Sequence, residues 1–373
     1  MVLNTFSTAA RTFFRKLNGC LSGIPLTVLL ALPLPVPGSE AGEPQRHEYL
    51  REKMAVPVRV IFYTDSPDLA DAAAEAVYRR FDEINAVMSD YDPESEIVRA
   101  CRESARTGEP AEISESLYRV LKRAREVGDL TSDAFDISVS PIVKLWRRSR
   151  RIGRRPPEDY LRRAQALVGP DKWELLESES VPPRYALRVL KEDVRLDLGG
   201  IAKGYAIDEG IRLLGELGIR SALIDAGGDI RVSAPPPEAE GWMIGGLSLE
   251  KEGKAAYYLP LAGAAMATSG DMFQYLEIGT VRYSHIIDPR TGEPLTTRST
   301  VTVLAPDAAT ADALASGISV LGPEEGVKLA GSFPGVETII FTASEDGALP
   351  RVFATGRFLR IREEFLKKAG KTD

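Results

Sequence analysis

The chain has 373 residues, a formal net charge of −7 at pH 7, 44% hydrophobic residues and two histidines. This composition predicts a globular core rather than bulk disorder, and the length suits one large domain or two ordinary ones. The acidic balance argues against a nucleic-acid-binding protein, which usually carries a basic surface. A small anionic ligand is compatible with it, because such a ligand needs only local donors or a metal ion.

The first 41 residues have the pattern of a leader. Residues 1–19 carry basic side chains and no acidic one, and a proline-broken apolar stretch starts at Cys20. This order is typical of a secretory signal peptide, so we expect an exported protein, soluble or loosely membrane-associated on the periplasmic side. A disordered extension is the alternative. Cys20 lies at the start of the apolar stretch and not after it, which disfavours a lipoprotein anchor. Without the leader Cys101 is the only cysteine, so no intrachain disulfide is expected.

The first half of the remaining chain predicts a strand, two helices and a loop. The polar stretch 39–50 is interpreted as a linker, and the apolar stretch 56–65 predicts a strand. Apolar residues at helical spacing predict a helix over 68–89, and a second helix is expected over about 113–128. The basic stretch 147–160 is interpreted as a solvated connecting loop.

The second half is richer in hairpins. Residues 185–200 predict two strands around a turn, and a helix follows from 201 to about 217. Residues 221–234 alternate around two glycines as in a β-hairpin, and 307–322 predicts a helix with Asp307 as its N-cap. Further strands are expected at 255–261, 273–278, 281–287 and 299–304, with two more near the C-terminus.

Helices and strands do not alternate regularly enough for a barrel or a Rossmann sheet. The pattern therefore predicts the α+β class, with mixed and antiparallel sheets and helices in a single large domain. We place the leader at residues 1–41 and this domain at residues 50–365.

The segment DLGGIAKGYAID (197–208) places two glycines between a predicted strand and a helix. Glycines let a ligand approach the backbone, and a helix N-terminus offers free N–H groups to an anion. Lys203 adds a positive charge one turn into the helix. The segment suits a phosphate or pyrophosphate, although it matches neither a Walker loop nor GxGxxG, and a tight turn without a ligand is the alternative.

Asp312 and Ser316 lie four residues apart on the predicted helix 307–322, which places them on one face. A carboxylate and a hydroxyl are hard oxygen donors suited to Mg²⁺, especially when a backbone carbonyl and ligand phosphates complete the coordination. A solvated aspartate and a serine bonded to its own helix are the alternative.

His285 lies in the crowded segment SHIIDPRTGEP (284–294), late in a predicted strand, and Asp288 opens the turn that follows. A histidine there can bond a phosphate or a ribose, or move a proton near neutral pH. A hydrogen-bonded structural histidine is the alternative.

Two further segments carry weaker signals. Tyr91 lies in the loop segment MSDYDPESE (88–96), where an aromatic ring can stack on a flat ligand, although packing is the simpler interpretation. The segment AFDISV (134–139) is interpreted on its own as a core phenylalanine beside an acid that caps a turn.

Taken together and in chain order, Met54 and the segments MSDYDPESE, AFDISV, DLGGIAKGYAID, DAGGDI, ATSGD, SHIIDPRTGEP and ADALASGISVLG resemble the FAD:protein FMN transferases of the ApbE flavin-transferase family. The resemblance extends over about residues 54–345. It implies a tunnelling-type α+β fold and a Mg²⁺-dependent, commonly exported enzyme. Such an enzyme cleaves FAD at its pyrophosphate, attaches FMN to a Thr or Ser of a partner protein and releases AMP. The implied acceptors are flavoprotein subunits such as those of sodium-pumping NADH:quinone reductase or Rnf-type electron-transfer complexes.

The resemblance also implies roles for individual residues. Gly200 would ligate the metal through its backbone carbonyl, and Asp312 and Ser316 through their side chains. His285 and Asp312 are the implied catalytic residues, with His285 either holding the nucleotide or moving a proton. The positions that match flavin-nucleotide contacts are Met54, Tyr91, Ala134, Phe135, Asp136, Asp197, Lys203 and His285.

The chain departs from the family pattern at three places. Asp133 stands where a glycine usually precedes Ala-Phe-Asp, Ile137-Ser138 replaces Pro-Thr, and Arg147-Arg148 replaces the Gly-Phe that usually follows the tryptophan. Two other functions stay open, an FAD diphosphatase that uses water as acceptor and a non-catalytic periplasmic flavin carrier. The Asp312 and Ser316 pair favours an enzyme, because a carrier needs no metal at the pyrophosphate.

Overall fold

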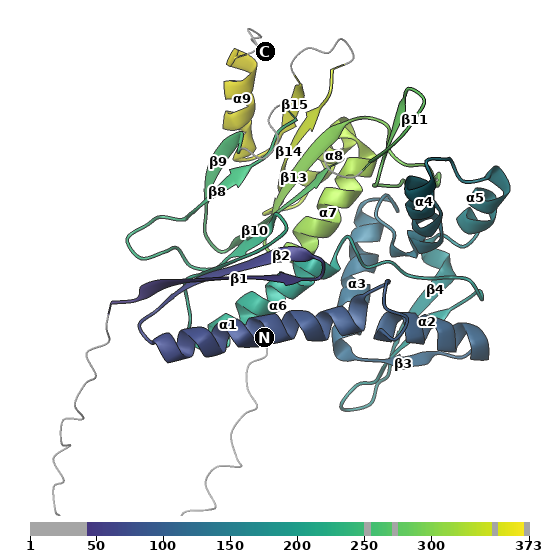
Figure 1. The fold of residues 1–373 in the computed structure, drawn as a ribbon, viewed down its shortest axis with the longest axis horizontal. Helices are drawn as coiled ribbons and strands as arrows, with labels where there is room; N and C mark the ends of the chain where they lie inside the picture. Colours follow the sequence, from purple (N-terminus) through teal and green to yellow (C-terminus); the bar gives the residue numbers. More distant parts are fainter. Residues whose placement is uncertain (1–42, 250–254, 271–274, 345–349, 369–373) are drawn as a thin grey trace, which may run out of the picture. The chain divides into compact units, whose positions relative to one another are not determined.

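An eight-stranded antiparallel sheet supports the helices that position the site (Figure 1). The computed structural model describes residues 43–249, 255–270, 275–344 and 350–368. The strand order is β1-β2-β6-β7-β10-β13-β14-β15. The bounds are β1 Gln45–Lys53, β2 Val56–Thr64, β6 Ala222–Ala226, β7 Asp229–Val232, β10 Ala264–Gly270, β13 Ser299–Ala305, β14 Glu337–Thr342 and β15 Arg351–Ala354.

Helices cover one face of this sheet. Helix α1 (Pro67–Met88) packs against β1 and β2, α6 (Ala202–Glu216) against β6 and β7, α7 (Ala308–Leu321) against β10 and β13, and α8 (Pro323–Gly331) against β14. Since strand side chains alternate between faces, every second residue of these strands joins the largest hydrophobic core beneath the helices. Helix α7 is therefore held from several sides.

The opposite face of the sheet carries a smaller core. It is covered by the hairpin of β8 (Trp242–Gly246) and β9 (Tyr257–Leu261) and by α9 (Phe358–Lys368). Aromatic rings dominate it: the Tyr257 ring lies 6.4 Å from Phe341. These elements bury the second face of the sheet.

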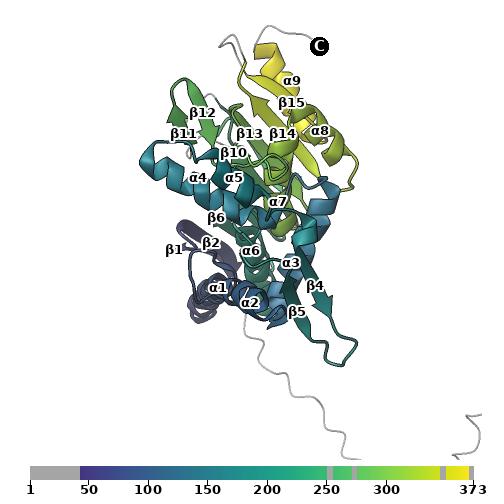
Figure 2. The same ribbon diagram turned by 90° about the vertical axis from the view of Figure 1, so that its right-hand side faces the viewer.

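A second group of elements lies beside the helical face. Helices α2 (Glu96–Thr107) and α3 (Glu115–Leu130) pack with a three-stranded sheet of order β3-β5-β4. Figure 2 shows α4 (Ser140–Ile152) beside the hairpin of β11 (Tyr275–Ile278) and β12 (Val281–Ser284), with which it shares a hydrophobic cluster that includes α5. The remaining bounds are β3 Ala111–Ile113, β4 Trp173–Glu177, β5 Tyr185–Val189, α5 Glu158–Gln165 and the 3-10 turns Ile137–Val139 and Pro170–Lys172.

Most of the predicted elements are present. The strand 56–65 is β2, the hairpin 221–234 is β6 and β7, and Asp307 caps α7 by accepting a hydrogen bond from Thr310 N at 2.8 Å. The predicted helices 68–89, 113–128, 201–217 and 307–322 correspond to α1, α3, α6 and α7.

Two interpretations of polar stretches are wrong. A linker is expected at 39–50, but strand β1 begins at Gln45. It is an edge strand with many charged, solvent-facing residues, so its sequence resembles a polar linker. The loop predicted at 147–160 is wrong as well, because α4 continues to Ile152 and α5 begins at Glu158. Arginine-rich sequence is usually solvated, but here one face of α4 is packed.

Of the two strands predicted at 185–200, the first is present and the second is not. Strand β5 ends at Val189, and residues 194–198 belong to no strand. Val194, Leu196 and Leu198 are buried alternately, as in a strand, but the backbone of this segment follows a loop. The leader and Asp271 of the ATSGD segment lie outside the described residues. Within the described part of the chain, no helix is long and apolar enough to span a membrane.

Candidate nucleotide and metal site

Helices α6 and α7 cross in direct backbone contact. A Cβ atom added at Gly204 would lie 2.2 Å from the Ala308 carbonyl oxygen, so the approach requires glycine. Asp208 accepts hydrogen bonds from the N–H groups of Ala308 and Ala309 at 2.8 and 2.9 Å, which satisfies the first turn of α7. This crossing brings the glycine-rich segment 197–208 against the α7 face that carries Asp312.

Lys203 forms the centre of a buried charged group. Its Nζ atom lies 2.9 Å from Asp229 Oδ2 and 3.2 Å from Asp312 Oδ2. Gly204 N also donates to Asp312 Oδ2, at 3.3 Å. Burial raises the pKa of Asp312 to about 7, although Lys203 opposes the shift. Burial disfavours the charge of Lys203, but Asp229 and Asp312 outweigh it and raise the pKa of the ammonium group. The lysine therefore stays charged.

Ser316 and Gly200 meet one turn farther along α7. A Cβ atom added at Gly200 would lie 3.3 Å from Ser316 Oγ and 3.2 Å from Phe135 Cε2. The structure thus brings the three predicted metal ligands into one region, with Asp312 on one side of it and Ser316 and Gly200 on the other. It also places Phe135 against them.

A second charged group surrounds Asp197. Arg147 Nη2 lies 3.0 Å from Asp197 Oδ2, and Arg147 Nη1 lies 2.6 Å from Asp90 Oδ2. Gly199 N donates to the other oxygen of Asp197 at 2.8 Å. Burial and the neighbouring Asp90 raise the pKa of Asp197, whereas Arg147 counteracts the shift. The guanidinium also lies over the Tyr91 ring, 4.4 Å from its centroid.

The segment 134–136 joins the two groups. Ala134 and Phe135 are buried, and Asp136 caps a short turn by accepting a hydrogen bond from Ser138 N at 2.8 Å. Burial raises the pKa of Asp136. Asp197 N donates to the carbonyl of the next residue, Ile137, at 2.7 Å. Met54 lies in the turn between β1 and β2, at φ 50°, half-buried against the core.

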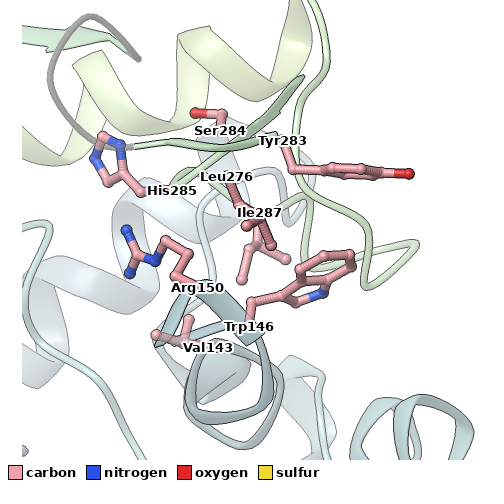
Figure 3. Close-up of a pocket in the computed structure, with 8 residues that line it drawn as sticks. All are labelled: Val143, Trp146, Arg150, Leu276, Tyr283, Ser284, His285 and Ile287. Atoms are coloured by element: carbon pink, nitrogen blue, oxygen red, sulfur yellow. The ribbon is translucent and has the colours of Figure 1, made fainter. Parts of the chain in front are cut away.

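His285 lies directly after β12 and lines a small pocket with α4 (Figure 3). The His285 ring and the Arg150 guanidinium lie on one side of this pocket, and Trp146 and Tyr283 lie on the other. Burial and the like charge of Arg147 lower the pKa of Arg150, so the two arginines are electrostatic neighbours. Arg150 is therefore near both the Arg147 group and His285.

Four residues of these groups are absent from the predicted site: Asp90, Arg147, Arg150 and Asp229. Asp229 lies in the DAGGDI segment, where its position after two turn glycines gives no hint of the contact with Lys203. The arginines lie in the stretch interpreted as a loop. The buried residues Ile142, Trp146 and Ser149 follow helical spacing that leads into this stretch, which indicates that its first part is packed.

The candidate metal donors near Lys203 are the Asp312 carboxylate, the Ser316 hydroxyl and the Gly200 backbone carbonyl. In the described ranges, no cluster of three or more His, Cys, Asp or Glu side chains has the arrangement of a metal site. Three oxygen donors leave positions in the coordination of a divalent ion such as Mg²⁺ for a phosphate or water.

Comparisons with known proteins point to one family. The ApbE family model matches residues 54–340. The chain is 33% identical to the FAD:protein FMN transferase of Haemophilus influenzae over 66% of this chain and 72% of the relative. It is 31% identical to that of Vibrio cholerae over 77% and 85%.

Solved structures give the same result. The flavin transferase ApbE from Vibrio cholerae has a TM-score of 0.73 at 27% identity, covering 85% of this chain and 99% of that one. The ApbE protein from Thermotoga maritima has a TM-score of 0.71 at 29% identity, covering 86% and 99%. These likenesses confirm the predicted α+β class.

Proposed function

The chain belongs to the ApbE family, and we propose that it is an FAD:protein FMN transferase that joins FMN to a Thr or Ser hydroxyl of an acceptor protein. In this reaction the hydroxyl oxygen attacks the phosphorus atom of the FMN half of FAD. The bond from that phosphorus to the bridging oxygen breaks, AMP leaves with the electron pair, and the hydroxyl proton is released. The observation that carries the proposal in this chain is the buried α7 face, where Asp312 and Ser316 lie beside Lys203 and Gly200.

The oxygen donors at α7 fit Mg²⁺. Ser316 Oγ and Gly200 lie together, and Asp312 precedes Ser316 by one helical turn on the same face. We propose that the Asp312 carboxylate, the Ser316 hydroxyl and the Gly200 carbonyl hold the ion. When bound, Mg²⁺ would neutralise charge on the pyrophosphate oxygens.

The remaining residues position the substrate. Lys203, held between Asp229 and Asp312, presents a fixed positive charge at the place where a pyrophosphate would approach. The Asp197 group and the segment 134–136 lie on the neighbouring side, where we place the nucleotide. His285 lines the pocket that contains Arg150 and is proposed as a further nucleotide contact.

The proposed activity is tested by mixing the purified protein with FAD and Mg²⁺, with and without an acceptor that carries an exposed Thr. Release of AMP only with acceptor, together with one added FMN in the intact mass of the acceptor, is the expected result. AMP release without acceptor would indicate an FAD diphosphatase. Bound FAD without AMP in either case would indicate a flavin carrier.

We also propose a location for the protein and a class of acceptor proteins. The basic and then apolar pattern of residues 1–41 supports export to the periplasmic side, with or without loose membrane association. Flavoprotein subunits of sodium-pumping NADH:quinone reductase or Rnf-type complexes are the acceptors to try first. N-terminal sequencing of the protein from its native host is expected to show a mature chain that begins near residues 37–45. Cytoplasmic protein with Met1 intact would overturn the proposal of export.

A further inference from the structure

We propose that Arg147 is a positioning residue for the flavin nucleotide, which fixes the Tyr91 ring and the Asp197 carboxylate as one preformed surface for a flat ring of the substrate. The inference rests on the proposed function. It concerns the binding of FAD, whereas the metal ligands on α7 concern the transfer step.

Arg147 joins three segments that are distant in the chain. It comes from α4, Asp90 follows α1, and Asp197 precedes α6. The side chains of Asp90 and Asp197 are only 7% and 9% exposed, so both carboxylates are largely shielded from water. A planar guanidinium can satisfy two carboxylates at once, while an ammonium group acts as a single point charge. The position therefore requires arginine rather than any cation.

The Tyr91 ring depends on this guanidinium. Tyr91 is 76% exposed, which would normally leave a loop side chain free to change rotamer. The Arg147 guanidinium carbon lies 4.4 Å from the ring centroid, and a cation over an aromatic face is attracted to it. Because Arg147 is itself held by two largely buried carboxylates, this contact favours one orientation of the ring while most of its surface stays open. An open aromatic face with a preferred orientation is suited to stacking on a flat heterocycle.

The same guanidinium controls the charge of Asp197. Two shielded carboxylates with no cation between them would repel each other, and Arg147 offsets part of that repulsion. The second oxygen of Asp197 binds Gly199 N, so the carboxylate is aligned with the glycine-rich segment that leads to Gly200. Arg147 thereby connects the exposed Tyr91 ring to the interior of the site.

Arg147→Gln and Arg147→Lys test the proposal, with Arg148→Gln as the matched control. Arg148 is the next residue on α4 and is exposed. FAD affinity is measured by quenching of flavin fluorescence without acceptor, and turnover is measured as a function of FAD concentration with acceptor and Mg²⁺ saturating. We expect Arg147→Gln to raise both Kd and KM for FAD by about tenfold, as the loss of a cation–π contact and an ordered carboxylate predicts, with kcat within about twofold of wild type. Arg147→Lys is expected to recover part of the affinity, and Arg148→Gln to behave as wild type.

A double-mutant cycle separates positioning from general structure. If Arg147 acts through the ring, Tyr91→Leu combined with Arg147→Gln loses little more affinity than the worse single variant. Additive losses would show that Arg147 does not act through Tyr91 and would overturn the proposal. So would unchanged FAD affinity in Arg147→Gln, or a fall in kcat at unchanged KM. If Arg147→Gln fails to fold, Arg147→Lys carries the same comparison, and wild-type affinity in that variant would overturn the need for a bridging guanidinium. If the wild-type protein binds FAD but transfers no FMN, the proposed function is refuted, and the effect of Arg147 on FAD binding can still be tested by the affinity measurements.

Discussion

Trp146 Nε1 donates a hydrogen bond of 3.2 Å to the Gly292 carbonyl, which ties α4 to the turn that follows His285. The turn is closed by Gly292 N, which donates to the Asp288 carbonyl at 2.8 Å. Helix α4, with Arg147 and Arg150, and the His285 segment are thus held together.

His285 is expected to act chiefly on FAD binding. His285→Ala should raise KM for FAD by about ten- to a hundredfold, as for loss of a hydrogen bond to a charged phosphate, and His285→Asn should lose less because it keeps a donor. Turnover at saturating FAD should change little. The measurement is a steady-state FAD titration of both variants at saturating Mg²⁺ and acceptor. A deep fall in turnover in both, by about 10²–10⁴-fold at unchanged KM, would instead assign His285 to proton transfer.

Asp312 is expected to be essential for transfer. Asp312→Asn keeps the shape of the side chain but removes the only charge among the proposed metal ligands, so AMP release should fall about a thousandfold. Ser316→Ala should be impaired and Ser316→Thr active, because threonine retains the hydroxyl. Mg²⁺ titrations of both activity and metal binding check this.

Ser319→Ala is the control for these variants. Ser319 lies one turn farther on α7 and donates to the Ala315 carbonyl at 2.7 Å, so its hydroxyl is used within the helix. The Ser319→Ala variant should respond to Mg²⁺ as the wild-type protein does. Wild-type activity of Asp312→Asn at limiting Mg²⁺ would place the metal elsewhere.

The crossing of α6 and α7 predicts opposite effects for two glycines of one helix. Gly204→Ala would press a methyl group into the Ala308 backbone and should reduce the free energy of unfolding by about 1–3 kcal/mol. Gly215 has nothing within 4 Å of an added Cβ, so Gly215→Ala should leave stability unchanged or increase it by up to about 1 kcal/mol. Urea denaturation measures both. Equal stabilities of the two variants would contradict the close approach.

Cys101 is expected to be unreactive in the folded protein. Burial raises the pKa of its thiol from 9.0 to about 11. The folded state therefore favours the neutral thiol, a contribution to stability that is complete below pH 9.0 and is lost as the pH rises through about 11. Alkylation at pH 8 should be at least about a hundredfold slower than in denaturant, from the thiolate fraction alone. The Cys20→Ser chain is the protein to use, and comparable rates in the two states would disprove the burial of the thiol.

The sequence predicts the parts of the site that depend on local spacing. Asp312 and Ser316 share a face because a helix places residues four apart together, and the glycines before α6 indicate a close approach of the backbone. The order of the motifs was specific enough to identify the family, which the comparisons confirm.

Contacts between distant segments could not be predicted in this way. Asp229 reaches Lys203 only because the β6–β7 hairpin and α6 pack on each other, and nothing local to Asp229 indicates it. A run of arginines is usually exposed, so the sequence predicts a solvated loop at Arg147. Its contacts with Asp90 and Asp197 arise from packing of α4 against segments 50 or more residues away in sequence.

The burial of α7 has a consequence for motion. Ala311, Ala313 and Ala315 are at most 1% exposed, so this helix opens only when much of the core opens with it. Its amide hydrogens should exchange near the global unfolding limit, while those of α4, one side of which faces solvent, should exchange through smaller local openings. Entry and release of a large dinucleotide would then be governed by fluctuations of α4, and the proposed metal ligands on α7 would keep their geometry from one turnover to the next.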